Sequence, residues 1–260
     1  MLKKLLSLGL VLMLIAGCSA KATADDSLKN VLDSGKLIVG FTEYPPMGFS
    51  ENGQDTGVDL DITKEVCSRL GVEPVFQYID WDSKVMELNG KTIDVIWNGL
   101  TITADREKEI LFSKPYFNNR IVIMTLADKT TNSIADLAGL KVGVEMASSG
   151  QQALEGSTVF SSLKEMVKFS TITEAVLDLR AGNIDAIVAD EIFARYAISK
   201  DATAFRVASE VFSSENYGIG FRMEDKALRD KVDEIIDAMV ADGTAAEISI
   251  KWFGEDLLTR

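Results

Sequence analysis

The chain of 260 residues is long enough for one large domain or for two lobes that each have a hydrophobic core. Hydrophobic residues make up 47% of it and prolines are few, which indicates an ordered globular protein. The formal net charge of −13 disfavours binding to nucleic acid or to an anionic membrane surface, and the sequence has no histidine, the commonest general base and metal ligand.

The first 27 residues differ in composition from the rest of the chain. Lys3 and Lys4 precede an apolar run that is too short for a permanent membrane-spanning helix. Residues 1–17 are therefore expected to be an export signal, and the residues that end at Cys18 resemble a bacterial lipobox, in which the cysteine is lipidated. The alternative is a buried N-terminal helix with a chance cysteine. Residues 18–27 are small and polar and are expected to form a flexible tether.

From residue 36 the chain alternates between apolar and amphipathic runs, which predicts strands and helices in turn. Two prolines make 42–49 a rigid loop, and Asp59 is expected to cap a helix that Gly71 ends. The expected elements are strand 36–41, helix 59–70, strand 74–78, helix 81–88 and strand 93–97. This βαβαβ order predicts a parallel sheet.

A second series follows an extended apolar run at 119–126. Its expected elements are strand 141–144, a helix from Gln151, strand 166–169, helix 173–181, strand 184–189, helix 191–199, strand 217–221, and helices 227–241 and 245–252. Residues 88–96 and 179–187 are similar, each with a helix end, a glycine, Ile-Asp and a strand. This similarity indicates either an internal repeat or only the common pattern of βαβ units.

The segment after strand 93–97 has the residue types of a small anion-binding site. Gly99 lets a ligand approach the backbone, Thr101 carries a hydroxyl, and Arg106 offers a planar fork of donors that fits a carboxylate. The alternative is a surface loop in which Arg106 pairs with Asp105 or Glu109.

A second polar site follows strands of the second series. Ser148 and Ser149 precede a helix, where backbone N–H groups favour an anion, and Asp190 follows strand 184–189. Ligands of open α/β sheets bind beyond the carboxyl ends of the strands, so two facing lobes would bring Arg106 and Asp190 into one cleft. Such a cleft would bind a zwitterion, for example an α-amino acid. The alternatives are an ordinary N-cap for the serines and a solvated helix cap for Asp190.

The order of these motifs resembles that of the solute-binding proteins of amino-acid ABC transporters, family 3 of the periplasmic or extracellular binding proteins. The motifs are Tyr44-Pro45-Pro46, Gly57-Val58-Asp59-Leu60-Asp61, Gly99-Leu100-Thr101-Ile102-Thr103, Arg106, Phe112-Ser113-Lys114-Pro115-Tyr116 and Asp190. The resemblance implies a type II periplasmic-binding fold, an α/β fold of two lobes, each a mainly parallel sheet flanked by helices, joined by two crossover strands. Lobe 1 would comprise 28–117 and 219–260, and lobe 2 would comprise 118–218.

The resemblance also implies roles for single residues. Arg106 would bind the α-carboxylate of an amino acid, assisted by Thr101 and by a backbone amide of Ser148-Ser149. Asp190 would bind the α-ammonium group, helped by the carbonyl of Gly99. The region that sets side-chain selectivity would contain Glu43, Tyr44, Phe49, Trp81, Lys84, Trp97 and Asn98. If Lys84 faces the cleft, it would favour a ligand whose side chain is acidic or accepts hydrogen bonds. If Glu43 points inward, it would favour a ligand whose side chain donates hydrogen bonds. The alternative for Lys84 is a solvated lysine on a helix.

The function implied is that of a lipid-anchored, extracytoplasmic protein that captures a polar amino acid and delivers it to the permease of an ABC importer. Such a protein is expected to be a monomer held at the membrane through Cys18, with no metal, cofactor, nucleic-acid partner or enzymatic activity. One alternative is an enzyme, because some proteins that resemble this family are dehydratases of small carboxylates, although no common catalytic motif is found in the sequence. The other is an adhesin or sensor lipoprotein.

Overall fold

The computed structural model of the chain describes residues 25–259. The predicted export signal 1–17, Cys18 and all but the end of the predicted tether lie outside this range. The predicted tether includes Ser27, but this residue begins helix α1 (Ser27–Ser34), and Asp25 accepts a hydrogen bond from the amide of Ala227. In residues 25–259 no helix has both the length and the apolar character needed to cross a membrane.

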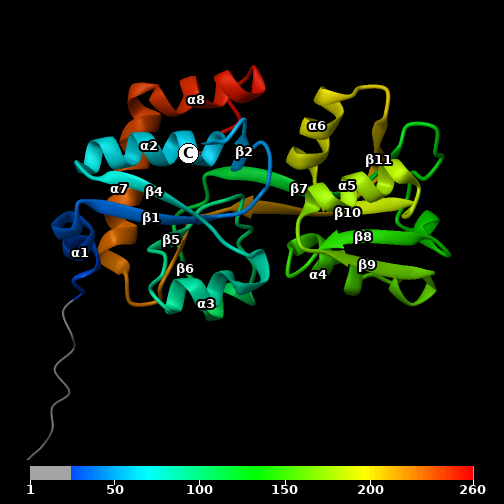
Figure 1. The fold of residues 1–260 in the computed structure, drawn as a ribbon, viewed down its shortest axis with the longest axis horizontal. Coiled ribbons are helices and arrows are strands. Elements are labelled where there is room, and N and C mark those ends of the chain that lie inside the picture. The colour runs from blue at the N-terminus through cyan, green and yellow to red at the C-terminus, as the bar shows by residue number, and fades with distance from the viewer. Residues whose placement is uncertain (1–24, 260) are drawn as a thin grey trace, which may run out of the picture.

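The protein has two lobes, each built on its own five-stranded sheet (Figure 1). The first sheet has the order β4-β1-β5-β12-β6, in which β1 is parallel to β4 and β5 and β12 is antiparallel to β5 and β6. Its strands are β1 (Lys36–Phe41), β4 (Glu73–Tyr78), β5 (Val95–Ile96), β6 (Leu111–Phe112) and β12 (Gly220–Phe221). The residues of β1, β5 and β12 are mostly buried, whereas those of β4, at the edge of the sheet, are half-buried or exposed.

The second sheet has the order β11-β7-β10-β8-β9, in which β8 is parallel to β9 and β10 and β7 is antiparallel to β10 and β11. Its strands are β7 (Phe117–Leu126), β8 (Lys141–Glu145), β9 (Glu165–Phe169), β10 (Ala186–Asp190) and β11 (Phe205–Tyr217). A separate hairpin of β2 (Phe49–Glu51) and β3 (Gln54–Thr56) extends from the first lobe. The α/β fold of two lobes predicted from the sequence is confirmed, but each sheet is mixed rather than mainly parallel, with two parallel and two antiparallel strand pairs.

Helices flank both sheets (Figure 1). The first lobe carries α1, α2 (Val58–Leu70), α3 (Lys84–Asn89), α7 (Lys226–Asp242) and α8 (Thr244–Phe253), and the second carries α4 (Ser149–Glu155), α5 (Ile172–Ala181) and α6 (Glu191–Lys200). Glycines in the left-handed conformation end α2 and α5, at Gly71 (φ 75°) and Gly182 (φ 76°), because glycine has no side chain to oppose it. Both ends agree with the sequence prediction.

The chain passes between the two sheets along strands β7 and β11. These strands are antiparallel neighbours, and their pairing extends from Phe205 opposite Leu126 to Tyr217 opposite Phe117. Figure 1 shows β7 reaching from the first lobe into the second. The two crossings therefore form one hydrogen-bonded ribbon rather than two separate linkers.

Three elements differ from the sequence prediction. The predicted strand 217–221 is interrupted, since β11 ends at Tyr217 and β12 begins at Gly220. Strand β11 has no clear apolar alternation, because most of its residues are half-buried or exposed, and the sequence therefore did not indicate it. The N-cap of α2 is Gly57, and Asp59 is instead buried inside the first lobe.

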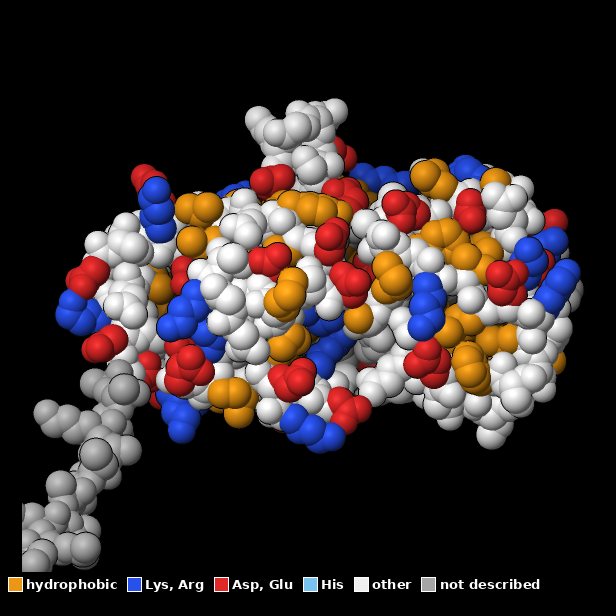
Figure 2. All heavy atoms as spheres, turned by 60° about the horizontal axis from the view of Figure 1, so that its bottom comes forward, with side chains coloured by type: hydrophobic (Ala, Val, Ile, Leu, Met, Phe, Trp, Pro, Cys, Tyr) orange, Lys and Arg blue, Asp and Glu red, His pale blue; other side chains and the backbone are white. Residues whose placement is uncertain are grey.

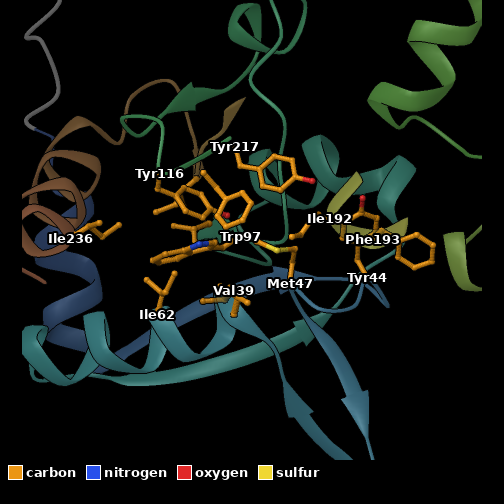
Figure 3. Packing of buried hydrophobic residues seen from close by; sticks show 14 of the residues in the cluster. Val39, Tyr44, Met47, Ile62, Trp97, Tyr116, Ile192, Phe193, Tyr217 and Ile236 are labelled. Atoms are coloured by element: carbon orange, nitrogen blue, oxygen red, sulfur yellow. The ribbon is translucent and has the colours of Figure 1, made fainter. Parts of the chain in front are cut away.

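Buried aromatic and aliphatic side chains fill the first lobe (Figure 3). Trp97 and Tyr116 lie together there, with ring centroids 6.3 Å apart and planes inclined at 67°. Met47 and Val39 belong to the same cluster. On the face that Figure 2 displays, acidic and basic side chains are interspersed.

Candidate functional site

A small cavity lies between the lobes, beyond the carboxyl ends of β1, β5, β8 and β10. Its volume, taken as the space open to the centre of a water-sized sphere, is about 10 Å³. The residues that line it are Thr42, Tyr44, Trp81, Asn98, Gly99, Thr101, Arg106, Glu145, Ser148, Ser149 and Asp190. Arg106 and Asp190, which belong to different lobes, therefore lie at one cavity, in the position where open α/β sheets bind ligands.

Arg106 lies at the first-lobe side of the cavity and is half-buried. Its guanidinium donates through Nη1 to the carbonyl of Thr101 (2.8 Å) and through Nη2 to the carbonyl of Ala147 in the second lobe (3.1 Å). Burial lowers its pKa, and the charges of nearby acids, Asp190 first, oppose this effect. The side chain is thus held in place by neutral carbonyls, which leave its positive charge uncompensated by direct contact.

Asp190 is the last residue of β10 and is only 7% exposed. Its carboxylate accepts hydrogen bonds from the hydroxyls of Tyr44 and Tyr217 (2.8 Å for Tyr217) and from Nδ2 of Asn119. Burial raises the pKa of Asp190 to about 6, and the donors from the two tyrosines limit the rise. The sequence did not indicate Asn119 or Tyr217 as partners, because they come from strands that are distant in the chain.

Two of the alternatives left by the sequence are thereby decided. Among residues 25–259 Arg106 has no ion pair with a neighbouring acid, and Asp105 pairs with Lys108 instead (2.6 Å). Asp190 occupies the N-cap position of α6, but its side chain makes no capping hydrogen bond and is not solvated. The side chains of Arg106 and Asp190 therefore both face the cavity.

Hydroxyl groups lie beside Arg106. Thr101 Oγ1 is 3.2 Å from Ser149 Oγ and donates to Glu215 Oε2 (3.0 Å). Ser148 is the N-cap of α4, where its Oγ accepts from the amide of Gln151 (3.0 Å). The N-cap alternative for Ser148 is thus correct, although the residue also lines the cavity.

Gly99 has a left-handed backbone (φ 61°), and a Cβ added there would lie 3.3 Å from the Tyr44 ring. Its amide donates to Oδ2 of Asp59 (2.7 Å), and Tyr116 donates to Oδ1 of the same carboxylate (2.8 Å). Burial raises the pKa of Asp59 to about 7. Asp59 therefore fixes the backbone that places Gly99 and Asn98 at the cavity.

Four residues predicted for the selectivity region do not line the cavity: Phe49, Trp97, Glu43 and Lys84. Phe49 packs against Trp252 and a tyrosine of α6, with centroids 6.1 and 5.8 Å away. Trp97 is fully buried in the first-lobe core beside Tyr116. The carboxylate of Glu43 accepts from the amide of Ser50 (3.2 Å) in its own loop.

Lys84 is 4% exposed, so its alternative as a solvated helix lysine is wrong. Its Nζ donates to the carbonyls of Trp81 (2.8 Å) and Ala147 (3.3 Å) and lies 4.7 Å from the centroid of the Trp81 ring. Burial, and the charge of Arg106, lower its pKa to about 7. Lys84 therefore links the lobes beside the cavity without lining it.

Glu145, which was not predicted as a site residue, lines the cavity and is 3% exposed. It is the last residue of β8, one position beyond the predicted end of that strand. Burial and the charge of Asp190 raise its pKa to about 8. Its position three residues before Ser148 was a signal, because residues at the carboxyl ends of these strands reach the cavity. In the part of the chain described, no cluster of side chains is arranged to bind a metal ion.

Known proteins resemble the chain over both lobes. Residues 37–255 match the family described as bacterial extracellular solute-binding proteins, family 3. The L-cystine-binding protein TcyJ of Escherichia coli strain K12 is 33% identical over 253 residues, or 94% of this chain and 92% of that protein. An ABC uptake transporter substrate-binding protein from Streptococcus pneumoniae with bound histidine matches with a TM-score of 0.87 at 31% identity, over 91% of this chain and 99% of the other. Tv2483 bound to L-arginine matches with a TM-score of 0.84 at 31% identity, over 90% and 97%.

Proposed function

Since the chain belongs to the bacterial extracellular solute-binding proteins of family 3, we propose that it captures a free amino acid between its lobes and delivers it to the permease of an ABC importer. One observation carries the proposal. A guanidinium from the first lobe and a carboxylate from the second line the same cavity, and their charges are complementary to those of an α-amino acid. The ligands named for the related proteins, cystine, histidine and arginine, support it.

Arg106 is proposed to bind the α-carboxylate. A guanidinium has about five N–H donors in a fixed plane, and the carbonyls of Thr101 and Ala147 orient this plane without neutralising it. The hydroxyls of Thr101 and Ser149 flank the same side of the cavity, and a backbone amide of Ser148-Ser149 is proposed to add a further donor. The carboxylate would thus replace water with several charge-assisted hydrogen bonds.

Asp190 is proposed to bind the α-ammonium group, together with the carbonyl of Gly99. Tyr44 and Tyr217 hold the carboxylate in one orientation, so little side-chain entropy is lost on binding. Asp59 holds Gly99 in the same way. A buried carboxylate of this kind is stabilised by a cation that enters the cavity.

We propose that the lobes close around the ligand by bending at the ribbon of β7 and β11. Hydrogen bonds that join the lobes, from Tyr44 to Asp190 and from Lys84 and Arg106 to Ala147, would form on closure. The lobe limits proposed from the sequence are retained, with 28–117 and 219–260 in lobe 1 and 118–218 in lobe 2. The order of the strands in the two sheets supports these limits.

We further propose that the protein acts outside the cytoplasm as a monomer, is held at the membrane by lipid on Cys18, and is not an enzyme. The basic start, short apolar run and small residues before Cys18 support the anchor. The family description supports an extracellular location and a binding role. Incorporation of labelled palmitate that is lost in Cys18→Ser would test the anchor, and incorporation that persists in this variant would contradict it.

Titration calorimetry of the purified chain against the common amino acids and cystine tests the proposed function. The expected result is saturable binding of at least one of them without turnover. The variant Arg106→Ala should bind the same ligand at least about 30-fold more weakly, because it leaves a carboxylate buried without its partner. The absence of binding to every amino acid by the folded wild type would refute the proposal.

A further inference from the structure

Glu145 is a buried acid at the cavity to which the proposed function gives no task. It is 3% exposed, it lines the cavity, and its Oε1 has no hydrogen-bond partner among the described residues. A buried carboxylate oxygen without a donor is costly, so such groups are normally paired in native proteins. The α-carboxylate and α-ammonium groups of the ligand are already accounted for by Arg106 and Asp190.

The cations of the protein do not satisfy this oxygen. Lys84 and Arg106 are close enough to act on the charge of Glu145, but their hydrogen bonds go to backbone carbonyls, including that of Ala147. The other charged or titratable groups that act on Glu145, or on which it acts, are Asp190 and Tyr44. The backbone amide of Ile172 also acts on this carboxyl group, but Oε1 still has no hydrogen-bond partner among the described residues, so a bound ligand can supply the donor.

We propose that Glu145 binds the far end of the ligand's side chain, and that the ligand is an amino acid whose side chain ends in a cationic hydrogen-bond donor. This inference rests on the proposed function, because it takes the positions of the two α-groups from it. Guanidinium, imidazolium, a side-chain ammonium and the second ammonium of cystine belong to this class. Cystine, histidine and arginine, the ligands named for the three related proteins described above, each carry such a group.

The charges around the cavity favour a cation over a neutral donor. Burial and Asp190 raise the pKa of Glu145 to about 8, so without a cation beside it the carboxyl group holds its proton at neutral pH. Burial and Arg106 lower the pKa of Lys84 to about 7, which weakens its repulsion of a second cation. A cationic side chain would lower the pKa of Glu145 and displace its proton into solvent.

The test compares ligands and variants by titration calorimetry of the whole purified chain. The ligands are L-arginine, L-lysine, L-histidine and L-cystine, with L-glutamate and L-methionine as ligands that lack a cationic end. Glu145→Gln keeps the size of the side chain and removes its charge. The matched control is Glu165→Gln, an exposed glutamate at the opposite end of the β8–β9 ladder. Thermal melting shows that each variant is folded.

We expect the wild type to bind at least one ligand of the cationic class more tightly than L-glutamate and L-methionine. Glu145→Gln should weaken that binding by about tenfold or more, as for loss of a hydrogen bond to a charged group, and Glu165→Gln should not. Binding by the wild type should also release a proton, seen as a dependence of the measured heat on the buffer, and Glu145→Gln should lose this release.

Two results would overturn the inference while leaving the proposed function intact. The first is tighter binding of L-glutamate or L-methionine than of the cationic ligands by the wild-type protein. This result would refute the inference even if Glu145→Gln does not fold. The second is a folded Glu145→Gln variant with wild-type affinity for its cationic ligand. A wild type that binds no amino acid at all would instead refute the proposed function, and the inference with it.

Discussion

Replacement of Asp190 by asparagine tests the proposed site most directly, because it removes one charge and almost no volume. Asp190 is 7% exposed and accepts hydrogen bonds from Tyr44, Tyr217 and Asn119. An asparagine keeps one acceptor oxygen, but its amide group faces donors. The carboxylate that is proposed to pair with the α-ammonium group is lost, and with it the favourable electrostatic energy of the pair.

The magnitude follows from the burial of the pair. Two unit charges about 4 Å apart attract with about 4 kcal/mol at an effective dielectric constant of about 20. The asparagine oxygen recovers part of this through a neutral hydrogen bond of about 1 kcal/mol. The net loss of about 3 kcal/mol lies within the range measured for buried charge pairs and corresponds to an increase in Kd of about 100-fold.

The assay is titration calorimetry with the amino acid that the wild type binds, and thermal melting confirms that the variant is folded. Asp230→Asn is the matched control, because this aspartate is exposed on α7 and does not line the cavity. We expect the control to bind as the wild type does. A folded Asp190→Asn variant that retains the wild-type Kd would refute the assignment of this carboxylate to the α-ammonium group.

Four further outcomes are expected. Gly99→Ala should lower the free energy of unfolding by about 1–2 kcal/mol, because its φ of 61° disfavours a side chain, and an unchanged urea midpoint would contradict this. Burial raises the pKa of Asp59 to about 7. Protonation of Asp59 therefore contributes its full share of the free energy of unfolding below about pH 4, and this contribution is lost as the pH rises toward about 7. In urea unfolding, the free energy of unfolding of Asp59→Asn should not show this loss, which amounts to up to about 4 kcal/mol in the wild type. The same pH dependence in the wild type and the variant would contradict this expectation. Thr101→Val should weaken binding by about 1 kcal/mol in calorimetry through loss of a hydroxyl, and an unaltered Kd would exclude that contact. Saturating ligand should reduce the radius of gyration in small-angle scattering, and an identical curve would argue against lobe closure.

Much of the fold could be predicted from local sequence. Apolar strands, glycine stops and the βαβ order are written in neighbouring residues, so β1, α2 and α5 appear within a residue or two of their predicted limits. Strand β11 could not be predicted, because its stability comes from pairing with β7 along its length rather than from a pattern of its own. The break at Gly218 also depends on strand pairing rather than on a local pattern. Residues 217–221 were therefore predicted as one continuous strand.

The placement of site residues depended on which way each side chain faces. Asp190, at the carboxyl end of β10, and Asn98, two residues beyond β5, reach the cavity, because the carboxyl ends of these strands meet there. Phe49 and Trp97 do not, although they are close in sequence to residues that do, because their side chains are directed into packed clusters. Glu145 was missed because its one-residue extension of β8 depends on pairing with Phe169 in the neighbouring strand.

The paired crossings of β7 and β11 have a consequence for how quickly and how tightly a ligand can be held. Two separate flexible linkers would let the halves of the molecule tumble over many relative orientations, and each capture event would have to freeze that freedom. The hydrogen bonds between the paired strands restrict the sliding of one crossing past the other. Fewer relative orientations of the halves then have to be lost on binding, and more of the binding free energy remains available for affinity.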